Sequence, residues 1–138
     1  MQKVVIDTNV FVSALIQRGY PFHILDQLFI ENKIILCVSD KLLEEYFEVL
    51  SRNKFSKYHE FFIKAEQLLA DIVEKSIKYH PKIKLNIISD IDDNKLLELA
   101  DECHADFLIT GNINDFTMSR YKKTKIVTPK EYWENHKP

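Results

Sequence analysis

The chain has 138 residues, of which 46% are hydrophobic and 29% are charged, and its formal net charge is −2. This length suits one domain with a substantial core, so we expect a single domain over residues 1–138. Two widely separated glycines, Gly19 and Gly111, exclude the glycine-rich phosphate loops of dinucleotide-binding domains and P-loop nucleoside triphosphatases. The near-neutral charge lacks the global basic field of many nucleic-acid binders, although a local patch or a metal ion could still hold a phosphate.

Short β-branched or apolar runs alternate along the chain with segments of helical spacing. The predicted strands, in chain order, cover residues 4–6, 34–38, 107–110 and 126–127. The predicted helices cover residues 10–17, 21–32, 40–52, 57–79, 93–104 and 129–135. Ser39 and Thr128 are good N-caps for two of these helices. Residues 81–89 are expected to be extended or irregular, and residues 121–125 to form a basic turn.

This alternation is typical of an α/β fold with a short parallel sheet. Ligands of such folds bind outside the carboxyl ends of the strands. Polar residues stand at two of these ends: Asp7 closes the first strand, and Thr110 closes the third, followed by Asn112 and Asp115. Two further acids are selected by helical geometry, because Glu45 borders an apolar stripe and Asp93 lies within one.

Each acid also has an ordinary structural explanation. Asp7 could bind backbone N–H groups of a turn, Glu45 could pair with a lysine, and Asp93, with its acidic neighbours, could cap a helix. Asp115 could cap the turn before Met118. Four acids at one end of a sheet instead favour a site for Mg²⁺ or Mn²⁺, which prefer carboxylate and water ligands. The five histidines are scattered and the two cysteines are expected to be reduced core residues, so no zinc site competes.

Four segments occur in the order found in PIN domains: VVIDTNVFVSALI, SDKLLEEYFEVL, DIDDNKLLELA and ADFLITGNINDF. The chain therefore resembles the PIN-domain family, and within it the prokaryotic toxins of toxin–antitoxin pairs. The resemblance implies a three-layer α/β/α fold and metal-dependent cleavage of single-stranded RNA. It implies that the catalytic and metal-binding acids are Asp7, Glu45, Asp93 and Asp115, supported by Asn9, Ser39, Thr110 and Asn112.

The sequence departs from the family pattern at Asn112, where many relatives carry Asp. An asparagine brings no charge, so a site with two tightly held ions is less well supported than a site with one. The resemblance further implies a homodimer and a small antitoxin partner. Because the N-terminus does not resemble a signal peptide and no stretch is long enough to span a membrane, a cytoplasmic protein without membrane association is expected.

In the resulting hypothesis, carboxylates hold Mg²⁺ or Mn²⁺, and the cation allows an acidic site to accept RNA. Positive side chains must still guide the strand, and Arg120, Lys122 and Lys123 in a basic segment are the expected RNA-binding residues. The alternative within the family is a PIN fold that binds RNA or protein without cleaving. A receiver-like signalling domain and a haloacid-dehalogenase-like phosphatase both fit less well, because each needs a further acid beside Asp7.

Overall fold

The computed structural model describes residues 1–88 and 90–138 and contains a six-stranded sheet in the order β3-β2-β1-β4-β6-β5. Neighbouring strands are parallel except at the pair of β5 and β6, which is antiparallel. The strands are β1 (Lys3–Ile6), β2 (Ile35–Val38), β3 (Ile77–Lys78), β4 (Phe107–Ile109), β5 (Arg120–Tyr121) and β6 (Thr124–Val127). The central strand β1 is apolar on both faces because helices cover both sides of it.

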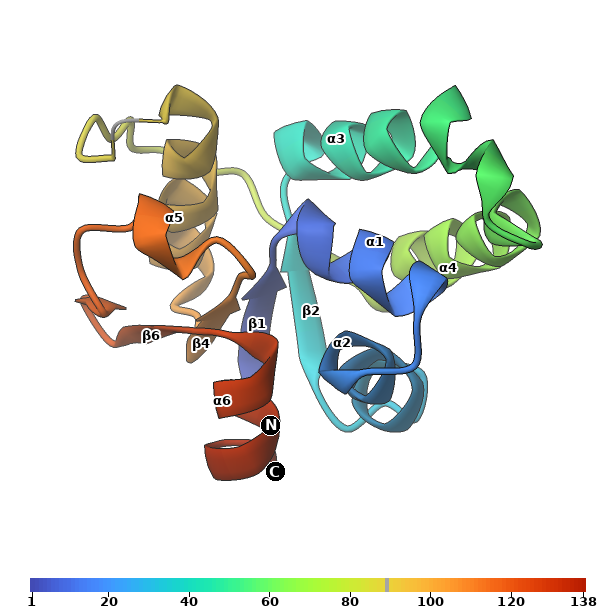
Figure 1. Ribbon diagram of the computed structural model, residues 1–138. Coiled ribbons are helices and arrows are strands. Elements are labelled where there is room, and N and C mark those ends of the chain that lie inside the picture. Colours follow the sequence, from blue (N-terminus) through green and yellow to red (C-terminus); the bar gives the residue numbers. More distant parts are fainter. Residues whose placement is uncertain (89) are drawn as a thin grey trace.

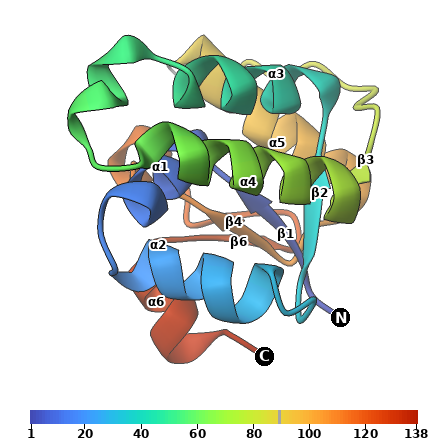
Figure 2. The ribbon, with the colours of Figure 1, turned by 90° about the vertical axis from the view of Figure 1, so that its right-hand side faces the viewer.

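Helices form a layer on each side of the sheet (Figure 1). One face is covered by α5 (Ile91–Cys103), which packs against β1, β2 and β4. The other face carries α1 (Thr8–Ile16), α2 (Tyr20–His23) and α4 (Phe61–Lys75), which Figure 2 shows in front of the strands. The remaining helices are α3 (Asp40–Leu50), beyond the carboxyl end of β1, and α6 (Pro129–Asn135), beside β6. The predicted α/β/α architecture is therefore confirmed.

The predicted helix over residues 57–79 is wrong at both ends. Residue 57 ends a 3₁₀ turn, η2 (Asn53–Lys57), and Glu60 adopts a left-handed conformation (φ 57°) that separates this turn from α4. At the other end, residues 77 and 78 form β3, because pairing with β2 satisfies their backbone groups. Helical spacing continued through this region, but strand pairing with a distant segment decided its structure.

Several other boundaries also differ. The helix predicted over residues 21–32 is α2 followed by a π-helical segment, η1 (Ile24–Phe29). The helix predicted over 93–104 starts two residues earlier, because the side chain of Asp90 accepts a hydrogen bond from the backbone N–H of Asp92. The basic turn predicted over 121–125 is part of the β5–β6 hairpin. The last residue of the irregular segment expected over 81–89 lies outside the described residues.

Both predicted N-caps are present. The hydroxyl oxygen of Ser39 accepts from the backbone N–H of Leu42 (3.2 Å), and that of Thr128 accepts from Glu131 N–H (3.1 Å). Cys37 and Cys103 are buried free thiols, as expected. Among the described residues, the helices lack the combination of length and apolar character that crossing a membrane requires.

Candidate functional site

An acidic cavity of about 350 Å³ lies at the carboxyl end of the central strands. It is bounded by the residues after β1, by one face of α3, by the start of α5 and by the loop that follows β4. Six carboxylates line this acidic cavity: Asp7, Glu45, Asp90, Asp92, Asp93 and Asp115. The four acids predicted from the sequence are thus gathered in one cavity, together with two that the sequence had assigned only to a helix cap.

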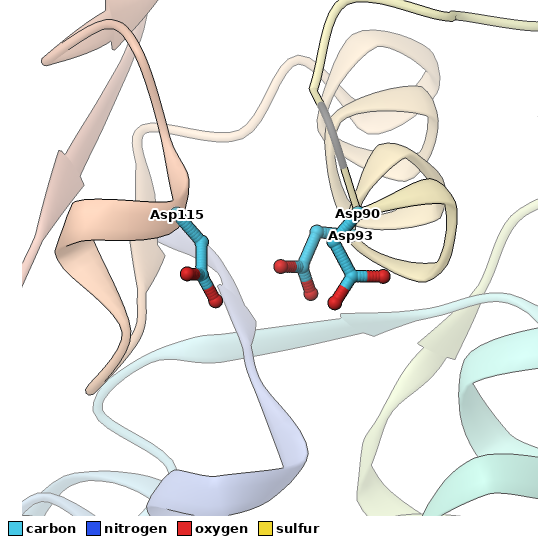
Figure 3. A group of neighbouring side chains, drawn as sticks. All are labelled: Asp90, Asp93 and Asp115. Atoms are coloured by element: carbon cyan, nitrogen blue, oxygen red, sulfur yellow. The ribbon is translucent and has the colours of Figure 1, made fainter.

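Three of the carboxylates lie close enough to share one ion. The ligand oxygens of Asp90, Asp93 and Asp115 are all within 4.8 Å of one another. Figure 3 shows the first two at the start of α5 and the third across from them, on η3 (Ile113–Asp115). Asp90 was expected only to cap the helix, and its position beside Asp115 depends on how the β4 loop folds back. No local sequence pattern signals this pairing.

Asp93 is the carboxylate with the least satisfied surroundings. Its Oδ2 atom is buried and has no hydrogen-bond partner within the described part of the chain. Burial, reinforced by the charges of Asp7, Asp90 and Asp115, raises the pKa of Asp93 to about 7. A buried carboxylate oxygen without a donor, surrounded by like charges, is the environment that a divalent cation would stabilise.

Asp7 is held in place by the loop after β4. The hydroxyl of Thr110 donates to Asp7 Oδ2 (2.8 Å) and accepts from the backbone N–H of Asn112 (3.0 Å). Burial raises the pKa of Asp7, and the hydrogen bond from Thr110 acts in the opposite direction. Asp7 is 6% exposed and Thr110 is fully buried, so the carboxylate has one fixed orientation toward the cavity.

Glu45 is already paired. Its carboxylate accepts a hydrogen bond from the Thr8 hydroxyl, and Lys95 Nζ lies 2.6 Å from the other carboxylate oxygen. Helix α3 is fixed above β1 because the buried Tyr46 hydroxyl donates to the carbonyl of Ile6. The pairing with a lysine, which the sequence left open for Glu45, is therefore present, and any metal ligation by Glu45 must compete with it.

The expected supporting residues divide between two places. Asn9 and Asn112 line the acidic cavity, and Thr110 acts on it through Asp7. Ser39 caps α3 and lines a neighbouring cavity instead. Its contribution to the acidic cavity in this structure is to fix the helix that carries Glu45.

The basic rim expected beside the acids is not found at residues 120–123. Lys122 and Lys123 lie at the hairpin turn that precedes β6, whereas the acidic cavity lies beyond the opposite, carboxyl ends of the parallel strands. Arg120 lies at the same end of the sheet, because its backbone is opposite Lys125, near the start of β6, in the β5–β6 hairpin. Both lysines are also engaged by carboxylates, Lys122 with Asp101 (2.5 Å) and Lys123 with Asp106 (3.3 Å).

The cations that do lie near the acids are Arg52 and Lys95. Arg52 lines the acidic cavity and makes a two-pronged ion pair with exposed Glu48, at 2.8 and 3.1 Å. Burial raises the pKa values of Asp7 and Asp93, and the charge of Lys95 opposes this rise without cancelling it. The sequence allowed Glu45 to pair with a lysine but did not identify it as Lys95, which reaches Glu45 because α3 and α5 face each other.

Two buried polar residues of α5 were also missed. Asn94 Oδ1 accepts from the backbone N–H groups of Ile87 (3.2 Å) and Ile88 (3.1 Å), and its amide donates to the Ile88 carbonyl (3.0 Å). Glu98 Oε2 accepts from the backbone N–H of Leu85 (2.8 Å). Helical spacing assigns Asn94 and Glu98 to the polar side of α5. They are nevertheless buried, because the preceding loop covers that side.

Comparison with known proteins agrees with this architecture. A PIN domain family profile matches residues 3–114. The chain is 38% identical, over 142 aligned positions, to the uncharacterized protein MJ1680 of Methanocaldococcus jannaschii, covering 96% of this chain and 90% of that protein.

Its fold is similar to a chain in the crystal structure of VapBC2 from Rickettsia felis bound to a DNA fragment from the promoter. That match has a TM-score of 0.57 and 16% sequence identity, and it covers 92% of this chain and 98% of the other. The family match includes all residues that line the acidic cavity except Asp115, which lies one position beyond its end. This chain belongs to the PIN domain family.

Proposed function

We propose that this protein is a metal-dependent endoribonuclease that cleaves single-stranded RNA and acts as the toxin of a toxin–antitoxin pair. PIN domains are generally nucleases, and in this proposal residues 1–138 form one such domain. The observation that carries the proposal is the buried, unpartnered oxygen of Asp93 beside the carboxylates of Asp90 and Asp115.

The donor set fits Mg²⁺ or Mn²⁺. All three neighbouring groups are carboxylates, and hard oxygen ligands with room for water suit these ions. Asp90, Asp93 and Asp115 would hold the cation, with Asp7 facing the same cavity. When bound, it would supply positive charge for the phosphate and acidity for a water that attacks in line.

The residues of the chain supply orientation. Thr110 fixes the Asp7 carboxylate, and Lys95 with Thr8 fixes Glu45 at the border of the cavity. Held in this way, Asp7 and Glu45 can accept protons or hydrogen bonds from water without moving. The expected products carry a 5′-phosphate and a 3′-hydroxyl, as the resemblance to PIN nucleases implies.

A PIN fold that binds RNA or protein without cleaving is the second candidate. Two observations favour it: Asn112 brings no charge to the cavity, and Glu45 is already neutralised by Lys95. Both reduce the negative charge available for a second ion. For the proposed enzyme, the same two features favour one tightly held cation over two.

The proposed partners are a small antitoxin and a second copy of the chain. The structurally similar chain belongs to a VapBC2 complex, which supports the antitoxin proposal. A small reading frame beside the gene, whose product co-purifies with this protein, would support it further. The homodimer follows from the resemblance, and sedimentation of the purified chain tests it.

The decisive experiment is incubation of the purified protein with single-stranded RNA and Mn²⁺. Cleavage should stop with a chelator and should fall by about 100-fold or more in Asp93→Asn and Asp115→Asn, because each change removes charge that holds the cation. Asp26→Asn is the matched control, because Asp26 is exposed on η1 and does not line the acidic cavity. Binding without cleavage by the wild-type protein would favour the second candidate, and equal cleavage in all variants would overturn the assignment.

A further inference from the structure

A second cavity, of about 290 Å³, lies at the same edge of the sheet as the acidic one. It is lined by residues that follow β2, residues that follow β3, and two side chains of α5. Because β1, β2, β3 and β4 are parallel, their carboxyl ends meet at one edge of the sheet. We call this second site the basic cavity, after Lys41, Lys82 and Lys84 in its lining.

The basic cavity has uncompensated positive charge. Lys41, Lys82 and Lys84 are exposed and form no salt bridge with any of the described residues. The lining also holds two carboxylates: Asp40 lies 3.0 Å from Lys78 and 3.9 Å from His80, and the buried Glu98 accepts a backbone hydrogen bond. The positive side chains of the lining therefore outnumber its carboxylates. Three exposed ammonium groups around one cavity favour an anionic ligand.

The segment that carries two of these lysines is held in a defined conformation. Asn94 and Glu98 bind three backbone N–H groups of residues 85–88, immediately after the lysines. Lys82 and Lys84 are two residues apart and both line the basic cavity. The half-buried Tyr79 ring, which also lines the cavity, offers a surface on which a base could stack.

The two cavities adjoin at the pair of Lys95 and Glu45. Lys95 lines the basic cavity, Glu45 lines the acidic one, and their charged atoms are 2.6 Å apart. Lys41 and Glu45 are one turn apart on the same face of α3. A strand with a phosphate in the acidic cavity can therefore reach the lysines by continuing along α3.

We propose that the basic cavity binds the phosphates of the RNA strand that flanks the cleaved bond, through Lys41, Lys82 and Lys84. This inference rests on the proposed function, and it identifies where the RNA substrate lies beyond the cleaved bond. RNA fits better than an acidic protein segment, because the half-buried Tyr79 ring in the lining offers a base a stacking surface and the adjoining acidic cavity is where the proposed function places the cleaved phosphate.

The test is RNA binding by the double variant Lys82→Ala/Lys84→Ala. Binding of a fluorescent single-stranded oligoribonucleotide is measured with Mn²⁺ in an Asp93→Asn background, which keeps the RNA intact. Two lost phosphate contacts should weaken binding roughly tenfold and reduce the slope of log K against log salt by about 1.4. The matched control, Lys122→Ala/Lys123→Ala, removes the same charge at the opposite end of the sheet and should leave both quantities unchanged.

Equal effects of the two double variants, or no effect of Lys82→Ala/Lys84→Ala, would overturn the inference. The inference would also be overturned if an oligoglutamate peptide bound the Asp93→Asn protein more tightly than RNA does and lost this binding when Lys82→Ala/Lys84→Ala was added. That result would assign the basic cavity to an acidic protein segment. Failure of the proposed function has a different signature, because it is read from cleavage by the protein with Asp93 intact. Both lysines are exposed, so melting temperatures should confirm that the variants fold.

Discussion

The hydroxyl of Thr110 donates a 2.8 Å hydrogen bond to the carboxylate of Asp7, joining residues 103 positions apart in the chain. Each follows the last residue of a strand, β1 or β4, and these strands are paired in parallel. Parallel pairing brings the two strand ends to the same level, so the hydrogen bond is a direct consequence of the sheet register. It explains how a buried carboxylate can keep one orientation at the edge of the acidic cavity.

Thr110→Val should therefore impair both stability and cleavage. Valine keeps the shape of threonine but removes the donor, which leaves a buried Asp7 oxygen unsatisfied and costs about 1–3 kcal/mol of unfolding free energy. Loss of orientation should lower Mn²⁺ affinity or activity by about 10–100-fold. Chemical denaturation and Mn²⁺-dependent cleavage check these effects. Thr110→Ser, which retains the hydroxyl, should restore both, and failure of this rescue would assign Thr110 a packing role only.

Asp93→Asn should stabilise the metal-free protein, and more so at higher pH. Burial raises the pKa of Asp93 from 3.8 to about 7 in the folded state, so the folded protein retains a proton that the unfolded chain releases. The stability that this retained proton gives the folded state is therefore lost as pH rises from about 4 to about 7. Asparagine is uncharged at every pH and does not undergo this loss. The Tm of Asp93→Asn should therefore exceed that of the wild-type protein by more at pH 8 than at pH 5.

The measurement is thermal unfolding with a chelator at the two pH values, repeated with Mn²⁺. For a domain of this size, 1 kcal/mol shifts the Tm by about 4 °C, so the effect is measurable. Added Mn²⁺ should raise the Tm of the wild-type protein more than that of the variant. An equal Tm difference at both pH values would show that Asp93 is not held in a charge-repelling environment.

Lys95→Met should destabilise the metal-free protein through Glu45. The pair is partly buried, with side-chain exposures of 16% for Lys95 and 27% for Glu45. Removing the lysine leaves a half-buried carboxylate beside other acids, and we expect a loss of about 1–2 kcal/mol, discounted for this exposure. Urea denaturation measures it. The double variant Lys95→Met/Glu45→Gln should recover most of the loss, whereas additive losses would indicate that the two side chains act independently.

Asn94→Ala should loosen the segment that precedes α5. The variant loses the acceptor for two backbone N–H groups, which are then partly buried without partners, so we expect a loss of about 1–3 kcal/mol. Hydrogen exchange of the Ile87 and Ile88 amides should accelerate by about tenfold or more, because each amide opens at a lower free energy. Asn86→Ala is the control, because Asn86 is exposed on the same segment. Unchanged exchange in Asn94→Ala would mean that the segment is held by packing alone.

The fold and most of the acidic cavity could be predicted from the sequence because their signals are local. Apolar runs such as Val4–Ile6 mark buried strands, Ser39 marks a helix start, and the acids Asp7 and Asp115 follow strands whose parallel order places them at one edge. Helical spacing also placed Glu45 at the border of an apolar stripe. The long helix was predicted wrongly where spacing continued but Ile77 paired with β2 instead.

Charge partners were decided by the tertiary structure alone. The sequence placed Lys122 and Lys123 in a basic segment, but the direction of β6 puts them at the end of the sheet away from the acids. Lys95 meets Glu45 across 50 positions because α3 and α5 pack together, and Asp90 meets Asp115 because the loop after β4 folds back. Residue spacing determines which face of an element a side chain occupies, whereas the packing of elements determines which faces meet.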